Sequence, residues 1–345
     1  MAGTGKAHLR PAEDALLRVE DLLVEFPAGK GHTVHAVTGI SFDVLHGETL
    51  GLVGESGCGK STTGRAIMQL PRPTGGRIKF QGSELTDMRG EDMRQLRTNV
   101  QMIFQDPISS LNPRRRVCDI VMEPLNIWKI GTPAERTAKM RAVLETVGID
   151  PDVASSRRPY EFSGGQCQRI CIARALVLDP KLIICDEPVS ALDVSVQAQV
   201  LNLLEDLKAQ YGLTLVFIAH DLAVVKNVSD RVAVMYLGKM CEVAASDELY
   251  RAPSHPYTQA LLKAIPVPDP TVALDPSGRI QGEIPSPLAP PSGCRFRTRC
   301  PYAQERCASE EPQLRDIGEG HYVACHFPLL APDRSRAAPP VAVMT

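Results

Sequence analysis

The sequence lacks a long apolar run. No stretch approaches the roughly 18 apolar residues that a membrane-spanning helix needs, and residues 1–14 lack the apolar core of a secretory signal. Strong net charge is also missing: 38 Lys and Arg against 40 Asp and Glu leave −2, so no overall basic field attracts nucleic acid or an anionic membrane surface. These absences predict a protein that stays where it is made, binds no nucleic acid and reaches a membrane only by docking on an integral partner.

Internal repeats are absent too, and the remaining bulk numbers describe a globular protein. The 345 residues, 43% of them hydrophobic, can bury a full core and suggest one large domain with an appendage or two modest domains. Six of the ten cysteines are scattered through predicted helices and strands, where a reducing compartment would keep them as thiols. The other four crowd near the C-terminal end.

One stretch matches a nucleotide-binding pattern at every fixed position. Residues 54–62, GESGCGKST, fit the phosphate-loop pattern GxxxxGK[ST]. The glycines permit positive φ and close approach of a phosphate, Lys60 brings a positive charge, and Ser61 offers a hydroxyl oxygen to Mg²⁺. Residues 49–53 are typical of a buried strand and residues 62–70 of a helix whose N-terminal dipole would face the anion. The sequence therefore predicts a nucleoside triphosphate site.

Two further side chains near this loop carry predictions. Cys58 lies at the start of the predicted helix beside Lys60, which should lower the pKa of its thiol. Alkylation should then block hydrolysis, and bound ATP should protect. Phe26, upstream of the loop, could stack on a nucleotide base or be an ordinary core aromatic residue, and both interpretations stay open.

Strand and helix patterns alternate along the chain and predict an α/β fold. Two fully apolar runs, 182–185 and 215–219, suit the middle of a parallel sheet. Residues 134–147 carry a helical apolar stripe, which Thr132 can cap and Pro133 can open. The other predicted strands are residues 16–26 and 34–45, which form an antiparallel layer, and residues 77–81, 100–104, 231–237 and 240–243.

Two motifs downstream of the loop carry chemistry. Asp186 and Glu187 directly follow the apolar strand 182–185, at the end of a parallel strand where ligands bind. An aspartate there can hold the Mg²⁺ shell, and the glutamate can polarise an attacking water. The second motif, residues 162–166 (FSGGQ), precedes a helical run, so that Ser163 is a natural N-cap and the helix start a second anion-binding end.

Six motifs in this order resemble the nucleotide-binding subunit of an ABC transporter. They are GESGCGKST, Gln105 after a strand, FSGGQ, LIICDEP, the segment 190–193 (SALD) and His220 at the end of a strand, and they span about residues 16–243. The resemblance implies an ATPase that uses ATP and Mg²⁺, with a RecA-like parallel sheet, an antiparallel β layer and a helical subdomain at about residues 106–175. Phe162 departs from the leucine that is usual before the serine, which should have little effect.

The resemblance implies a role for each matching residue. Glu187 would be the general base, His220 the γ-phosphate sensor, and Gln105 a contact to the metal and the lytic water. Ser61, Gln105 and Asp186 would hold Mg²⁺. The nucleotide would be contacted by Phe26, Gly54, Ser56, Gly57, Cys58, Gly59, Lys60, Ser61, Thr62, Gln105, Ser163, Gly164, Gly165, Gln166, Asp186 and Asp193.

The same resemblance implies partners. Two cassettes of this family face head to tail, and the SGGQ helix start of one closes on the γ-phosphate held by the other, so a second ABC ATPase subunit is expected. The helical insert 106–158 would touch two integral membrane permease subunits, with Gln105 as the hinge. The chain would then lie peripherally on the cytoplasmic face of the cell membrane.

The C-terminal part narrows the resemblance. Residues 255–262 (HPYTQALL), 282–285 (GEIP) and 291–294 (PSGC) resemble the C-terminal extension of oligopeptide and dipeptide permease ATPases, also seen in nickel-uptake relatives. The match to the F-type subunit implies a D-type partner in a heterodimer and, indirectly, an extracellular substrate-binding protein. The expected division is a flexible start at 1–14, the nucleotide-binding domain at 15–250, the extension at 251–328 and a disordered tail at 329–345.

The four cysteines of this extension could hold a cofactor. Cys294, Cys300, Cys307 and Cys325 are separated by five, six and seventeen residues, which lacks the paired CxxC of common zinc ribbons. Four thiolates could take a structural zinc or an iron–sulfur cluster, and the family resemblance favours [4Fe-4S]. Two disulfides or four unliganded thiols are the alternatives. The three arginines between Cys294 and Cys300 would offset the charge of a cluster or simply be solvated.

The expected function is ATP hydrolysis that drives uptake of oligopeptides or dipeptides. Nickel or another substrate stays open, since selectivity in such importers belongs to other subunits. The rivals are a soluble ABC-type ATPase of DNA repair or translation and a regulatory module that binds ATP without turnover. Coiled-coil arms or a second cassette would favour the first rival, and neither is visible in the sequence.

Overall fold

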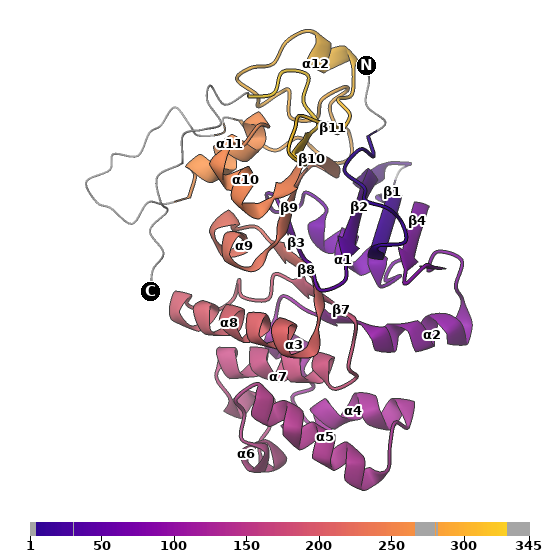
Figure 1. Ribbon diagram of the computed structural model, residues 1–345, viewed down its shortest axis with the longest axis vertical. Helices are drawn as coiled ribbons and strands as arrows, with labels where there is room; N and C mark the ends of the chain where they lie inside the picture. The colour runs from indigo at the N-terminus through magenta and orange to yellow at the C-terminus, as the bar shows by residue number, and fades with distance from the viewer. Residues whose placement is uncertain (1–4, 30, 266–279, 281, 330–345) are drawn as a thin grey trace, which may run out of the picture. The chain divides into compact units, whose positions relative to one another are not determined.

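The computed structural model describes residues 5–29, 31–265, 280 and 282–329. Residues 1–4 of the predicted flexible start, residues 266–279 and 281 of the predicted extension and residues 330–345 of the predicted tail lie outside the described residues. The chain forms two compact units (Figure 1). The first unit comprises the described residues up to 45, residues 49–86 and those from 219 onward; the second comprises residues 46–48 and 87–218. The domain boundaries expected from the sequence stay predictions.

An antiparallel sheet forms one part of the first unit, as the sequence predicts. Its strand order is β2-β1-β4-β5, and β1 pairs with both β2 and β4 in antiparallel register. Buried side chains such as Leu17, Val19 and Phe42 give these strands an apolar face. The bounds are β1 (Ala15–Pro27), β2 (Thr33–Leu45), β4 (Gly75–Phe80) and β5 (Ser83–Glu84).

A second group of strands in the first unit carries the phosphate-loop segment. β3, buried along its whole length, lies parallel to β9, and β10, β12 and β11 continue antiparallel from β9. In Figure 1 the orange helices α10 and α11 lie beside β10. The bounds are β3 (Thr49–Val53), α1 (Lys60–Ile67), α9 (Leu222–Val228), β9 (Arg231–Tyr236), β10 (Lys239–Ala245), α10 (Ser246–Arg251), α11 (Pro256–Lys263), α12 (Arg306–Ser309), β11 (Arg315–Asp316) and β12 (Tyr322–Val323).

The second unit combines parallel strands with helices. β7 pairs with β6 on one side and β8 on the other, both parallel, which confirms the apolar runs as central parallel strands. Helices α4, α5 and α6 contact one another, and α4 and α5 contact α7 (Figure 1). The bounds are α2 (Gly90–Asn99), β6 (Val100–Ile103), α3 (Pro107–Ser110), α4 (Val117–Trp128), α5 (Pro133–Thr146), α6 (Pro151–Ser156), a 3₁₀ turn (Pro159–Glu161), α7 (Gly164–Leu176), β7 (Leu182–Asp186), α8 (Val194–Tyr211) and β8 (Thr214–Ala219).

The start of α5 shows how local sequence sets these elements. The Thr132 hydroxyl accepts a hydrogen bond from the Glu135 N–H, and the Glu135 carboxylate accepts one from the Thr132 N–H, with Pro133 at the first helical position. The stripe residues Met140 and Leu144 are buried, as predicted. Among the described helices, none has the length and apolar content that crossing a bilayer would take.

Candidate functional site

The loop between β3 and α1 has the backbone that its glycines permit. Gly54 has φ +151° and Gly59 has φ +103°. A Cβ on Gly54 would lie 2.1 Å from the Met235 carbonyl oxygen, and one on Gly59 would lie 2.3 Å from the Ala36 carbonyl oxygen. Both positions therefore exclude larger residues by close backbone approach as well as by dihedral angle. Gly57, at φ +79°, faces open space instead.

Lys60 already lies inside this loop. Its side chain is buried, with 3% of the residue exposed, and Nζ donates hydrogen bonds to the carbonyl oxygens of Gly54 (2.7 Å) and Glu55 (3.0 Å). The Gly238 N–H, from the turn between β9 and β10, donates to the Cys58 carbonyl oxygen at 2.9 Å. The loop is thus preformed around an ammonium group that phosphate oxygens can attract.

The other predicted loop residues line its outer side and the helix start. Ser56 and Gly57 are exposed, whereas Ser61 and Thr62 are half-buried in the first turn of α1. This first turn contains no acidic residue, and Gly59 is the N-cap without a capping side chain. Because no side chain caps this helix start and no carboxylate lies in its first turn, the N-terminus of α1 suits an anion.

The prediction for the Cys58 thiol is wrong. Its pKa is raised, because burial of the thiol disfavours the thiolate more than Lys60, with Nζ 3.8 Å from Sγ, favours it. Only 4% of Cys58 is exposed. The sequence shows the neighbouring charge but gives no measure of the burial that outweighs it.

Glu55 has partners that the sequence did not predict. Its backbone N–H donates to the Tyr257 hydroxyl oxygen at 2.8 Å, and its carboxylate accepts hydrogen bonds from the guanidinium of Arg299 at 2.7 and 3.0 Å. Tyr257 is the second residue of α11, and Arg299 directly precedes Cys300. Residues far along the chain therefore hold the second position of the loop.

In the second unit, Gln105 and Glu187 lie next to each other. The Gln105 amide donates to Glu187 Oε2 at 3.0 Å. Glu187 follows β7 with φ +47°, an uncommon conformation for a non-glycine residue, and its N–H donates to the Ile218 carbonyl oxygen. The Ser190 hydroxyl and N–H donate to the Glu187 carbonyl oxygen. The Ile218 and Ser190 contacts hold the backbone of Glu187, and the Gln105 amide holds its carboxylate.

Asp186 and Asp193 differ in their surroundings. Asp186 ends β7 and is fully buried. Asp193 is exposed and caps α8, because its Oδ1 accepts from the Val196 N–H at 3.1 Å and from the Ser195 hydroxyl at 2.8 Å. These hydrogen bonds lower the pKa of Asp193. Its predicted contact with a nucleotide stays a prediction.

The SGGQ motif starts α7 as predicted. The Ser163 hydroxyl accepts from the Gln166 N–H, and the Gln166 side-chain oxygen accepts from the Ser163 N–H at 2.9 Å, which forms a reciprocal capping box. Gly164 is half-buried, whereas a Cβ on Gly165 would lie 2.4 Å from Val196 Cγ1 in α8. The lack of a side chain at Gly165 therefore lets the N-terminal turns of α7 and α8 lie close together.

Phe26 and His220 lie at strand ends. Phe26 is half-buried near the end of β1, where it pairs with Val34, and its stacking on a nucleotide base stays a prediction. His220 is exposed directly after β8.

The phosphate loop belongs to the first unit, and Gln105, Asp186 and Glu187 belong to the second. Their common action on one nucleotide stays a prediction.

The four cysteines of the C-terminal part line one pocket. Cys294, Cys300, Cys307 and Cys325 share this pocket with Tyr302 and Phe327, among others. Burial raises the pKa of Cys294 to about 11 and that of Cys325 to about 12, which favours neutral thiols. All ten cysteines are free, so the alternative of two disulfides is not found. No group of three or more His, Cys, Asp or Glu side chains within the described ranges is arranged to hold a metal ion, so neither [4Fe-4S] nor zinc is supported.

Comparison with known proteins adds the family. The model of the ABC transporter family matches residues 37–190, and that of the oligopeptide/dipeptide transporter C-terminal region matches residues 241–307. The oligopeptide transport ATP-binding protein OppF of Salmonella typhimurium is 51% identical over 323 residues, which cover 90% of this chain and 95% of the relative. The chain belongs to the ABC transporter family. Within this family, AppF of Bacillus subtilis, also named an oligopeptide transport ATP-binding protein, is 49% identical over 91% of this chain and 98% of its own.

Solved structures of ABC cassettes agree with this membership. The ATP-binding cassette MJ0796, in a dimeric post-hydrolysis state bound to ADP and Pi, superposes with a TM-score of 0.61 at 26% identity, over 67% of this chain and 98% of that one. CbiO1 of Clostridium perfringens, part of an ABC transporter complex, gives the same TM-score at 28% identity, over 69% of this chain and 91% of its own. As an ABC family member with this fold, the chain is an ATPase.

Proposed function

We propose that this chain is the ATP-hydrolysing subunit of an ABC importer that drives uptake of oligopeptides or dipeptides across the cytoplasmic membrane. The observation that carries the proposal is the joint presence of a preformed phosphate loop at residues 54–62 and a match to the oligopeptide/dipeptide transporter region at 241–307. The curated relatives OppF and AppF are named for oligopeptide transport. The chain would act peripherally, on the cytoplasmic face.

The chemistry of the proposed site follows from donor type and position. The loop N–H groups and Lys60 would bind the β- and γ-phosphates. Mg²⁺ would be held by oxygen atoms of Ser61, Gln105 and Asp186, the hard ligands that it prefers, and would neutralise charge on the phosphates. Glu187, oriented by Gln105 at 3.0 Å, would accept the proton of the attacking water.

Replacing Glu187 by glutamine tests the base. A positioned general base contributes roughly 10²–10⁴-fold, so turnover should fall by at least about 100-fold while ATP affinity stays within a few fold of wild type. A stable dimer should then accumulate with ATP, as measured by size-exclusion chromatography with light scattering. Glu161→Gln, an exposed carboxylate in the same unit, is the control and should hydrolyse ATP normally. Full ATPase turnover by the Glu187→Gln protein would contradict the assignment of Glu187 as the general base.

The capping box at Ser163 supports the second cassette as a partner. This exposed helix start, with Gln166 beside it, offers N–H groups and no acidic side chain in its first turn. We infer that it binds the γ-phosphate held by a partner's loop, and that the partner is a D-type homologue. Co-expression with such a homologue should give a heterodimer with higher ATPase activity than either chain alone. Equal activity of the isolated monomer would contradict this inference.

Exposed apolar residues support docking on membrane subunits. Ile108, Ile127 and Tyr160, in the helical part of the second unit, are 62%, 55% and 66% exposed. We infer that these side chains contact the permease subunits, as the family resemblance implies for this helical insert. Co-purification with a detergent-solubilised permease complex, lost when Ile127 is replaced by Asp, tests this docking; a soluble ABC-type ATPase would not co-purify in either form.

The cysteine pocket leaves the iron–sulfur prediction to be tested directly. Four sulfur donors line one pocket, but the described side chains do not form a metal-holding group, so no step of the proposed mechanism depends on a cluster. Iron, zinc and acid-labile sulfide should be measured on protein purified without oxygen. About four irons and four sulfides per chain, lost on Cys307→Ser, would establish the cluster.

A further inference from the structure

Glu55 puts a negative charge into a loop that binds a polyanion. It is the second residue of GESGCGKST, and its side chain is 24% exposed. An uncompensated carboxylate next to bound phosphates would repel them, because charges near a protein surface interact more strongly than in bulk water. A cation at this position is therefore needed.

Arg299 supplies that cation. Its Nη1 donates to Glu55 Oε2 at 2.7 Å and its Nη2 to Oε1 at 3.0 Å, a two-pronged pair with defined geometry. Only 6% of the Arg299 side chain is exposed, so the pair is shielded from salt on the arginine side. Glu55 in turn raises the pKa of Arg299, which keeps the guanidinium charged. The sequence-based alternative of a solvated arginine is thus wrong for Arg299.

An aromatic cluster fixes the direction of this arginine. The rings of Tyr236, Tyr257 and Phe296 pack with centroids 4.8 to 5.2 Å apart. The guanidinium lies 5.8 Å from the Tyr236 ring centre, and Nη1 is 3.4 Å from its hydroxyl. Tyr257 accepts the hydrogen bond of the Glu55 N–H. The same cluster therefore holds both the backbone and the charge of Glu55.

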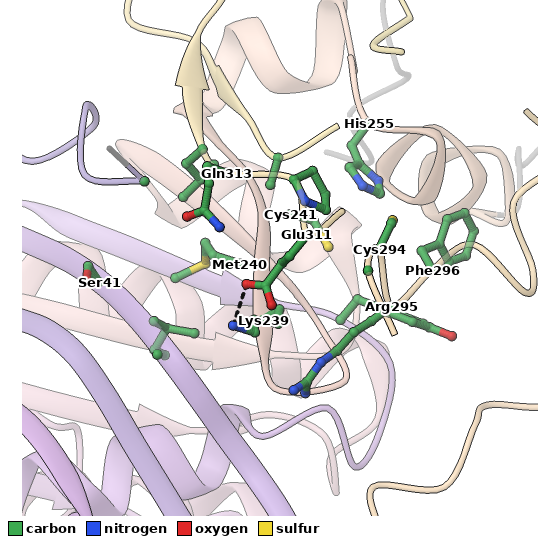
Figure 2. A pocket seen from close by; sticks show the side chains of 18 residues that line it. Ser41, Lys239, Met240, Cys241, His255, Cys294, Arg295, Phe296, Glu311 and Gln313 are labelled. Carbon is green, nitrogen blue, oxygen red and sulfur yellow. Dashed lines mark hydrogen bonds and ion pairs between the residues drawn. The ribbon is translucent and has the colours of Figure 1, made fainter. Parts of the chain in front are cut away.

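The chain around Arg299 is anchored to the sheet as well. Cys294, Arg295 and Phe296 line a small pocket together with Cys241 of β10 (Figure 2). Arg295 donates to the Leu237 carbonyl oxygen in the β9–β10 turn, the turn whose Gly238 N–H holds Cys58. Residues 294–299 thus contact the phosphate loop directly through Arg299 and indirectly through this turn.

We propose that Arg299 is a positioning residue of the ATP site, which neutralises Glu55 and fixes the phosphate loop from the C-terminal part of the chain. The proposal rests on residues 54–62 being the phosphate loop. Arg299 acts through Glu55 and not on the nucleotide. The ATP affinity of the cassette is accordingly set in part by residues that lie outside its nucleotide-binding motifs.

Removing the two charges one after the other separates this role from simple structural support. Arg299→Met leaves the Glu55 carboxylate without its cation, and the ATP dissociation constant should rise about tenfold, measured by calorimetry on the purified full chain. Adding Glu55→Gln removes the repelling charge and should restore affinity to within about threefold of wild type. The loss should also shrink at 1 M salt, where the screening length is only about 3 Å. Loss of a merely structural contact would be neither rescued by Glu55→Gln nor reduced by salt.

Two controls make the result decisive. Arg306 pairs with Glu310 on the surface of the same C-terminal part, and Arg306→Met should leave ATP affinity unchanged. Lys60→Ala should abolish binding; if it does not, residues 54–62 are not the ATP site and both proposals fall. If Lys60→Ala loses ATP but Arg299→Met binds it like wild type, only the role of Arg299 is refuted. If thermal melting shows that Arg299→Met folds poorly, Arg299→Lys replaces it, because lysine keeps the charge but loses the two-pronged geometry. Arg299→Lys should show a smaller loss of ATP affinity, which Glu55→Gln should again relieve. Unchanged ATP affinity of Arg299→Lys would equally refute the role of Arg299.

Discussion

Replacing Gly54 by alanine tests whether close backbone approach, and not flexibility alone, shapes the phosphate loop. The added Cβ would lie 2.1 Å from the Met235 carbonyl oxygen, although such contacts are not found below 3.0 Å, so the loop must move by about 1 Å. Met235 lies in β9, which pairs with β3 and β10, and its carbonyl group cannot yield easily. The clash and the φ of +151° together should cost about 3 kcal/mol of unfolding free energy.

The shift should also weaken ATP binding. Moving the loop by 1 Å breaks at least one charged hydrogen bond to phosphate, about 2 kcal/mol, which corresponds to a roughly 30-fold higher dissociation constant. Melting followed by circular dichroism and titration calorimetry with ATP measure the two effects. Gly57→Ala is the matched comparison, because Gly57 also has positive φ (+79°) but no neighbour within 4 Å; it should cost only about 1 kcal/mol. Equal effects of the two substitutions would refute the steric reasoning.

Three further outcomes are expected. Gly165→Ala pushes a methyl group against Val196 Cγ1, at 2.4 Å, so it should reduce ATPase turnover severalfold while ATP binding to the isolated chain is kept; unchanged turnover would contradict the tight α7–α8 contact. Asp43 is fully buried, which raises its pKa, but hydrogen bonds and charge from Arg10 and Arg231 outweigh burial and lower the pKa overall. The Asp43 carboxylate therefore stabilises the fold above pH about 3.8, and this stabilisation is lost as pH falls through the folded-state pKa. Asp43→Asn should cost about 2 to 4 kcal/mol of unfolding free energy near pH 7, and urea titrations should show that the difference from wild type vanishes in strong acid. Cys58, with its raised pKa, should react slowly with iodoacetamide at pH 7 and faster as pH rises, and rapid labelling at pH 7 would contradict its burial.

Local motifs were predictable because their physics is local. The strand at 49–53, the loop glycines and the Ser163 N-cap each depend on residues within a few positions, and the structure confirms them. The buried parallel strand 182–185 was predictable because a fully apolar run bounded by charged residues suits few other environments. Helix α2, by contrast, was not predicted, since only Met93 is buried along it and no apolar stripe marks it.

What the sequence could not show is burial and distant pairing. Nothing near Arg299 in the chain indicates Glu55, because the two are 244 residues apart and an Arg–Glu pair has no sequence periodicity. The thiol of Cys58 was misjudged for the same reason: the charge of Lys60 is two residues away, but the desolvation comes from tertiary packing. The four cysteines were correctly grouped by their crowding, yet spacing alone could not tell a metal-holding arrangement from thiols that share a pocket.

The contacts of Lys60 explain why the loop needs an arginine from elsewhere. The Lys60 ammonium donates hydrogen bonds to the carbonyl oxygens of Gly54 and Glu55 and so offsets negative charge at this end of the loop. In the proposed ATP site this ammonium would bind phosphate oxygens, and its charge would no longer serve the protein side. The Glu55 carboxylate would then face the phosphates with its charge unmatched unless another cation stays in place. Arg299, which donates to both oxygens of Glu55 and has only 6% of its side chain exposed, would supply that cation in the proposed site.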